Sequence, residues 1–484
     1  MLGVVHALRP LSFIAAILIS CSLPTPATVS PSPIPSASAG SAAVLPTTVF
    51  DAVKAKAHVD YLADPARAGR YSGSAGYLDA AMYVADRFRE IGLEPLGDNG
   101  TFFQHFTMPI VDLTAMSVLA TGEKAYRPRV DFTESVGGRS GSGGVEAEIA
   151  VVGGAARSGG QNDFAGANVR GKIALITGPG APGGASVVES AYQEGAAAVL
   201  VIGGATLRYS FGPRFQAATI PTLVITEDVA NELMAPSGKK VSDERASVNA
   251  RRSDPTAPPS GFDIPTTVRV SVSLTPVHDV DAINVVGLLR APDDAGKRAV
   301  LVGGHLDGVG TDPDGSVFQA ANDNASGPAV TIEVARALAW VQTSLTHSVV
   351  FVAFAGEEEG FFGSEAYVAQ TATTPGRVES LIAMINLDVI GCCSDTLLVS
   401  NEVPDLQRKV RETATSFGIA TQSIGGGGSD QTSFARRRVP AVFIGMSDFI
   451  LHVYADKPSV VEASRLKKAG DVVTTVARQL ATAN

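Results

Sequence analysis

The last third of the chain carries two histidines and several acids at points where apolar stretches end. The residues that could do chemistry there are His305, Asp307, Asp323, Glu357, Glu358, Asp388 and His452. Imidazole nitrogens and carboxylate oxygens are ligands of Zn²⁺ in catalytic sites, where one coordination position stays open for water. A spare carboxylate beside a ligand can accept a proton from that water. This set of residues therefore predicts metal-assisted hydrolysis.

These side chains suffice for two metal ions if one carboxylate bridges both ions. Two ions about 3.5–4 Å apart can hold both the attacking water and the substrate carbonyl. A bridging group has to be short and rigidly held. Asp323 fits this requirement, because it lies between Asn322 and Asn324 in a turn rich in side-chain hydrogen bonds that precedes a helix.

The elements that position these residues follow an α/β pattern from Asp281 onward. Strands are predicted at 283–289, 298–303, 348–355, 381–389 and 441–446, and helices at 327–342, 404–417 and 459–482. This alternation predicts a mostly parallel mixed sheet with helices on both faces. Such sheets bind ligands at the carboxyl ends of their strands. Because His305, Glu357 and Asp388 lie at such ends, we expect them to converge.

An earlier segment, residues 116–279, has a different pattern. Glycine is dense, short β-type runs alternate with turns, and the segment has no histidine between Met116 and Leu274, which argues against a metal site there. We expect residues 254–276 to be a linker followed by a strand that leads back to the first domain. Residues 51–115 and 280–484 would then form one domain, with 116–279 inserted as a small β-rich α/β domain.

The acidic and histidine motifs, in this order, resemble the M28 family of zinc peptidases. The motifs are Gly304-His305-Leu306-Asp307, Asn322-Asp323-Asn324-Ala325-Ser326-Gly327, Gly356-Glu357-Glu358-Glu359-Gly360 and Asn386-Leu387-Asp388. Gly69-Arg70 also resembles the family's N-terminal segment. The resemblance implies a zinc exopeptidase with two Zn²⁺ per chain that hydrolyses peptides, and an aminopeptidase is the expected activity.

The resemblance also implies a role for each residue. One zinc would take His305, Asp323 and Glu358, and the other would take Asp323, Asp388 and His452. Glu357 would be the general base, and Asp307 would hold the tautomer of His305. The chain departs from the family at Leu451-His452-Val453, where Tyr-His-Thr is usual, and at Gln431, where histidine is frequent. The first departure bears on one metal ligand and the second on the substrate pocket.

Within the inserted segment, Val169–Ile176 followed by Glu194–Val199 resembles the protease-associated (PA) domain. Two alternative activities remain open beside the aminopeptidase: a carboxypeptidase or dipeptidase of the same family, and a mono-zinc acyltransferase resembling glutaminyl cyclase. A carboxypeptidase usually holds the substrate carboxylate with arginine. The run Arg436-Arg437-Arg438 could serve this purpose, but we interpret it as solvated surface. A non-enzymatic binding protein is disfavoured, because all the ligands are kept.

The N-terminus has the plan of an export signal. Residues 1–20 contain Arg9, no acid and an apolar core too short to span a bilayer comfortably. Leu18-Ile19-Ser20-Cys21 resembles the lipobox of bacterial lipoproteins, which implies cleavage before Cys21 and a lipid on its thiol. Residues 21–50 have no charged side chain and many Pro and Ser, so they form a tether. We therefore expect an exported protein, lipid-anchored to the bacterial cell envelope.

Composition sets further bounds on the 484-residue chain. A formal net charge of -10 argues against binding to nucleic acid, which requires a basic face. Three cysteines cannot build a disulfide framework. Cys392 and Cys393 are adjacent and could form a vicinal disulfide or stay as two buried thiols, of which we favour the thiols. The oligomeric state stays open.

Overall fold

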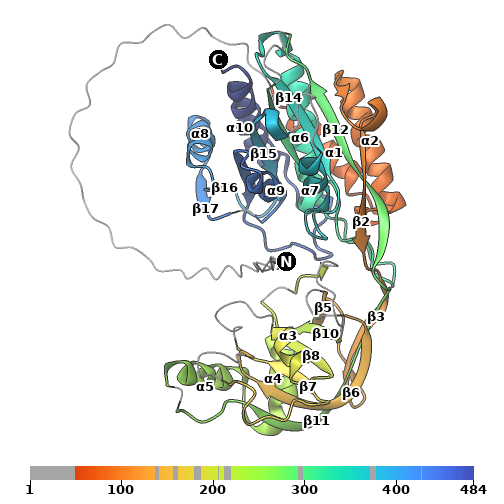
Figure 1. The fold of residues 1–484 in the computed structure, drawn as a ribbon, viewed down its shortest axis with the longest axis vertical. Coiled ribbons are helices and arrows are strands. Elements are labelled where there is room, and N and C mark those ends of the chain that lie inside the picture. The colour runs from red at the N-terminus through yellow and green to blue at the C-terminus, as the bar shows by residue number, and fades with distance from the viewer. Residues whose placement is uncertain are drawn as a thin grey trace, which may run out of the picture.

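The computed structural model describes residues 49–136, 141–155, 162–178, 187–204, 207–211, 220–254, 256–292, 298–370, 378–426 and 428–483. The predicted signal, Cys21 and nearly all of the tether lie outside these residues. The described chain forms two nine-stranded sheets, which lie one above the other in Figure 1. Across the described residues, no helix has both the length and the apolarity that a membrane crossing needs.

The first sheet contains the strands predicted for the α/β part of the chain. Its order is β1-β12-β14-β13-β15-β18-β16-β17, with β2 also paired to β12. The bounds are β1 (Glu94–Pro95), β2 (Phe103–Ile110), β12 (His278–Leu289), β13 (Ala299–His305), β14 (Ser348–Phe354), β15 (Leu381–Leu387), β16 (Leu397–Ser400), β17 (Thr421–Ile424) and β18 (Ala441–Met446). The central strands β14, β13, β15 and β18 are parallel, whereas β12 and β16 flank them in the antiparallel direction. The sheet is therefore mixed, with a parallel centre.

Helices cover both faces of this sheet, as predicted. One face carries α1 (Ala52–Leu62), α2 (Ala75–Ile91), α6 (Ser326–Ala339), α8 (Pro404–Ser416) and α10 (Ala463–Ala481), and the other carries α7 (Phe362–Ala369) and α9 (Gln431–Arg436). Alternate residues of β13 show this, because Val300 packs into the α6 core while Leu301 packs with Tyr367 of α7 and Phe434 of α9. Each buried aliphatic side chain contributes about 1.5–3 kcal/mol. The two cores hold the sheet rigidly, and with it the strand ends.

The second sheet lies within the inserted segment. Its order is β4-β3-β11-β6-β7-β8-β10-β5-β9. The bounds are β3 (Leu113–Thr121), β4 (Lys124–Ala125), β5 (Phe132–Val136), β6 (Gly143–Val152), β7 (Ile173–Ile176), β8 (Ala198–Ile202), β9 (Ser210–Phe211), β10 (Thr222–Ile225) and β11 (Phe262–Leu274), with helices α3 (Val187–Gln193), α4 (Glu227–Met234) and α5 (Val241–Ser253). We call residues 113–274 the insert.

The insert joins the rest of the chain at one edge, where β2 runs into β3 and β11 runs into β12 (Figure 1). The strand expected to lead back to the first domain is β11, and it is an integral part of the second sheet, paired on both sides with β3 and β6. The expected linker is therefore the short stretch between the end of α5 and the start of β11.

Candidate metal centre

The predicted metal ligands come together at the carboxyl ends of the central parallel strands. His305 ends β13, Glu357 and Glu358 follow β14, and Asp388 follows β15. Since β14, β13 and β15 are neighbours in the sheet, these three strand ends are adjacent. Two further ligands arrive from loops: Asp323 lies in the turn η5 (Ala321–Ala325) before α6, and His452 lies in the loop after β18.

Asp323 lies between the two imidazoles. Its Oδ1 is 3.4 Å from His305 Nε2, and its Oδ2 is 3.2 Å from His452 Nε2. His305 Nε2 also lies 3.2 Å from Asp388 Oδ1, and His452 Nε2 lies 2.8 Å from Glu358 Oε2. One oxygen of Asp323 thus faces each histidine, which is the arrangement that a bridging carboxylate requires.

The donor set fits zinc. Ligand atoms of His305, Asp323 and Glu358 lie within 4.8 Å of one another, and so do those of His305, Glu357 and Asp388. Glu358 Oε1 is buried and has no hydrogen-bond partner among the described residues. Removing several carboxylates from water is costly unless cations or hydrogen bonds compensate them. An imidazole and carboxylate set with a free buried oxygen is suited to hold such a cation.

Burial and neighbouring charges set the electrostatics of the centre. Desolvation raises the pKa of the Glu357 carboxyl well above its ordinary range; His305 opposes this shift, and Asp388 and Glu358 add to it. Burial would also raise the pKa of Asp323, but hydrogen bonds with His305 and His452 hold it below its ordinary value. The acid beside the ligands therefore favours holding a proton, while the shared acid stays ionised.

Asp307, predicted to orient His305, lies next to it without a hydrogen bond. The distance from Asp307 Oδ1 to His305 Nδ1 is 3.6 Å, which exceeds the usual hydrogen-bond range. The other carboxylate oxygen, Oδ2, accepts from the main-chain N–H of Glu358 at 3.3 Å. Asp307, which follows β13, is thus hydrogen-bonded to the segment after β14 that carries Glu358.

Arg70 is a contributor that the sequence did not reveal beyond its place in a motif. It is fully buried in η1 (Pro65–Arg70). Its guanidinium donates to four main-chain carbonyls, at 2.7 to 3.0 Å, those of Leu62, Leu306, Gln319 and Ala320. Burial lowers its pKa to about 10, while Asp456, Asp307 and other acids of the centre oppose this shift. Arg70 therefore stays charged at neutral pH, and its positive charge partly compensates the negative charge of the acids of the centre.

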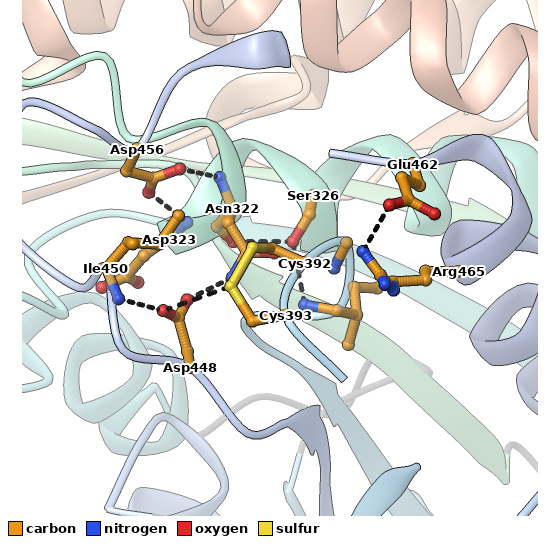
Figure 2. Close-up of a disulfide and its surroundings, with 12 residues drawn as sticks. Asn322, Asp323, Ser326, Cys392, Cys393, Asp448, Ile450, Asp456, Glu462 and Arg465 are labelled. Carbon is orange, nitrogen blue, oxygen red and sulfur yellow. Dashed lines mark hydrogen bonds and ion pairs between the residues drawn. A yellow bond between two sulfur atoms is a disulfide. The ribbon is translucent and has the colours of Figure 1, made fainter. Parts of the chain in front are cut away.

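Asp456 holds the turn that carries Asp323. Its Oδ1 accepts from the main-chain N–H of Asn322 at 2.7 Å, and its Oδ2 from that of Asp323 at 2.9 Å (Figure 2). Burial raises the pKa of Asp456 to about 7, although these two N–H groups oppose the shift. The spacing of four residues after His452 was the only signal of this residue in the sequence.

Cys392 and Cys393 form a vicinal disulfide, so the preference for two thiols was wrong. Adjacent side chains of an extended strand point to opposite faces. Here the pair lies in a turn after β15, and the backbone of Cys393 is left-handed (φ 70°). Figure 2 shows the disulfide beside Asp448, whose Oδ1 lies 4.0 Å from Cys393 Sγ. The other carboxylate oxygen of Asp448, Oδ2, accepts from Asn322 Nδ2. Asp448 thus links the surroundings of the disulfide to Asn322, the residue that precedes Asp323.

Two further predictions concern the surroundings of the centre. The run Arg436–Arg438 is exposed, and Arg436 pairs with Glu365 at 3.1 Å, in agreement with a solvated surface. Gln431, which departs from the family's pattern, is buried, and its Oε1 accepts from Asn386 Nδ2 at 3.1 Å. The Gln431 side chain therefore holds Asn386, near the carboxyl end of β15, by a hydrogen bond.

Parts of the chain are similar to known proteins. Residues 284–477 match the family model described as Peptidase family M28, and residues 145–233 match the model of the PA domain. The described fold is similar to a solved aminopeptidase from Aneurinibacillus sp. strain AM-1, with a TM-score of 0.66 and 23% identity over 90% of this chain and 95% of the other. This last likeness concerns the fold.

Two curated relatives match parts of the chain. A probable zinc metalloprotease of Pyrenophora teres f. teres is 39% identical over 117 residues, which are 24% of each chain. A probable leucine aminopeptidase of Arthroderma otae is 25% identical over 201 residues, or 39% of this chain and 56% of the relative. The chain thus spans between a quarter and about half of the length of these relatives. The two family-model matches agree with the predicted M28-like region and with the predicted PA-like insert.

Proposed function

Since residues 284–477 match the Peptidase family M28 model, we propose that the chain is a dizinc exopeptidase that releases N-terminal residues from peptides. The observation that carries this proposal is the placement of Asp323 between His305 and His452. A carboxylate shared by two imidazoles suits two ions better than one. The description of one partial relative as a leucine aminopeptidase supports the choice of the N-terminal end.

The contacts favour a different division of the ligands from the one that the sequence resemblance implied. His305 and Asp388 lie on the Oδ1 side of Asp323, whereas His452 and Glu358 lie on its Oδ2 side. We propose that one Zn²⁺ takes His305, Asp323 and Asp388, and the other takes Asp323, Glu358 and His452. Bound there, zinc supplies Lewis-acid polarisation of the scissile carbonyl and activation of a water molecule.

Glu357 is the proposed general base. Its carboxylate lies close to His305 and Asp388 at the strand ends. In the chain, Glu357 directly precedes the proposed ligand Glu358. From this place it takes the proton of the attacking water and passes it to the departing amine. A raised pKa makes the ionised Glu357 carboxylate a stronger base toward the water than an ordinary carboxylate.

Hydrolysis of aminoacyl-p-nitroanilides by the full chain, with and without a chelator, tests the proposal. We expect chelator-sensitive release that zinc restores, together with hydrolysis of peptides with free N-termini and not of N-blocked ones. Cleavage of N-blocked peptides from the C-terminus would shift the proposal to a carboxypeptidase. Absence of chelator-sensitive hydrolysis with every free or blocked peptide would refute it.

We also propose that the protein is exported and anchored through a lipid on Cys21. The vicinal disulfide supports export, because disulfides persist in oxidising compartments. Labelling of expressing bacteria with a palmitate analogue tests this proposal. Label should enter the wild-type protein and be absent from a Cys21→Ala variant; label in both would contradict the anchor.

A further inference from the structure

The insert reaches the metal centre through Tyr209. Two hydrogen bonds join this residue to His452: the imidazole Nδ1 lies 2.6 Å from the Tyr209 carbonyl oxygen, and the Tyr209 N–H donates to the His452 carbonyl at 3.3 Å. Arg208, the preceding residue, donates to the Asp448 carbonyl at 3.3 Å. Three hydrogen bonds thus connect one short segment of the insert to the loop that carries a metal ligand.

The contact fixes which nitrogen of His452 is available to a metal. A carbonyl oxygen only accepts, so the Nδ1 atom of His452 has to carry a proton. The lone pair is then left on Nε2, which faces Asp323 and Glu358. Metal-ligating histidines generally donate their second N–H to such a partner, which fixes the tautomer and ring orientation.

The backbone of His452 requires such support. Its φ of 53° lies in the left-handed region, which a non-glycine residue rarely adopts, and the residue lies in a loop between β18 and α10. Conformations of this kind persist where surrounding contacts hold them. Two of the contacts that hold His452, those at its Nδ1 atom and at its carbonyl oxygen, come from Tyr209 of the insert.

An ion-paired aromatic cluster holds Tyr209 in place. The Tyr209 ring stacks on Phe318 with centroids 5.3 Å apart, and Phe318 packs on Tyr454 at 4.5 Å. The buried Arg129 lies 4.4 Å from the Tyr209 ring centre and donates to Asp312 Oδ2 at 2.8 Å, while its Nη1 pairs with Glu134. Because Glu134 belongs to the insert and Asp312 to the other domain, the arginine joins both.

We propose that the insert is a positioning element of the metal centre: the carbonyl of Tyr209 holds His452 in the tautomer and orientation that metal binding requires. This inference rests on the metal centre proposed above. Within the part of the chain that the structure describes, the backbone passes between the insert and the other domain at one edge, where β2 runs into β3 and β11 runs into β12. Domains joined in this way move relative to each other unless their interface prevents it. Seating of the insert and metal binding at His452 are therefore coupled, and the coupling is reciprocal.

Zinc titration of the full chain against a competing chromogenic chelator tests the first half of this coupling. In Arg129→Met, we expect one of the two Zn²⁺ to bind about 10–100-fold more weakly and the other to be unchanged. Arg127→Met is the matched control, since Arg127 lies two residues away in an exposed pair with Asp131 and should leave both affinities within about twofold. Asp312→Asn provides a second, milder disruption of the same cluster. Unchanged affinities in both cluster variants would overturn the inference.

Hydrogen exchange of the wild-type chain tests the reciprocal half and needs no destabilised variant. Zn²⁺ should slow exchange in peptides that contain the Tyr209 amide, and this protection should vanish in His452→Ala. Protection that persists in His452→Ala, or no protection in the wild type, would overturn the inference. Neither measurement depends on hydrolysis, so a chain that binds zinc but cleaves no peptide would refute only the proposed function.

Discussion

Replacement of Arg70 by methionine tests whether the metal centre depends on a buried positive charge when zinc is absent. The arginine donates to four carbonyls, and each hydrogen bond to a charged group contributes about 1.5–3 kcal/mol. Part of this gain offsets the cost of burying the guanidinium. The net loss in Arg70→Met should therefore be about 3–5 kcal/mol, as for other single removals from buried charge clusters.

This loss is a large part of a typical unfolding free energy of about 5–15 kcal/mol. Urea unfolding of the full chain, followed by circular dichroism in the presence of a chelator, measures it. Zinc should recover part of the loss, since its charge replaces the missing one beside Asp323 and Glu358, so the stabilisation by Zn²⁺ should be larger in the variant than in the wild type.

Arg89→Met is the control, because Arg89 is an exposed arginine of α2 whose pair with Asp86 lies at the surface. It should change the unfolding free energy by less than about 0.5 kcal/mol. If the chelated Arg70→Met chain unfolds within about 1 kcal/mol of the wild type, or if zinc stabilises both chains equally, Arg70 does not compensate the acids and the reasoning fails.

Three further predictions concern single side chains. Glu357→Gln should keep both Zn²⁺, measured by elemental analysis, and lose about 10²–10⁴-fold in kcat; loss of zinc instead would make Glu357 a ligand. Asp456→Asn should weaken zinc binding about 10–100-fold in a chelator competition, because one of the two main-chain N–H contacts that hold the Asp323 turn is lost. Burial raises the pKa of Glu244 in α5 from 4.5 to about 7, so its ionisation destabilises the folded insert increasingly as pH rises through this window. Glu244→Gln should therefore stabilise the chain by about 1–2 kcal/mol at pH 8, after allowance for solvent screening, and not at pH 4, in urea unfolding at both pH values.

Much of the fold and the membership of the centre could be predicted because local patterns determine them. Apolar runs such as those of β13, β14 and β15 are continuous, as expected for strands buried on both faces. The short strands β16 and β17 at one end of the sheet were missed, because four residues with partly exposed positions give little periodicity. Helix α1 was also missed, although its buried positions, from Ala55 to Leu62, follow helical spacing.

The disulfide and the contact of the insert with His452 depend on geometry that no local pattern records. The turn that carries the disulfide contains a left-handed residue, Cys393, and nothing in the neighbouring residue types specifies this conformation. The contact between Tyr209 and His452 joins residues 243 positions apart on two domains. The contact between Tyr209 and His452 depends on the position of the insert relative to the other domain. The side chains around Arg129 contribute to this position, and neither the Tyr209 segment nor the His452 loop specifies it alone.

The division of ligands between the two proposed ions shows most clearly what topology leaves open. In the sheet, β15 lies between β13 and β18, so a reader of the strand order would pair His452, which follows β18, with Asp388, which follows β15. The loop after β18 instead brings His452 to within 2.8 Å of Glu358, which follows β14. Asp456 ties this loop to the Asp323 turn, and Tyr209 ties it to the insert. In the proposed division, the contacts of one loop thus decide the ligand partner of His452. Loosening these contacts should impair binding of the ion proposed at His452 before binding of the ion proposed at His305.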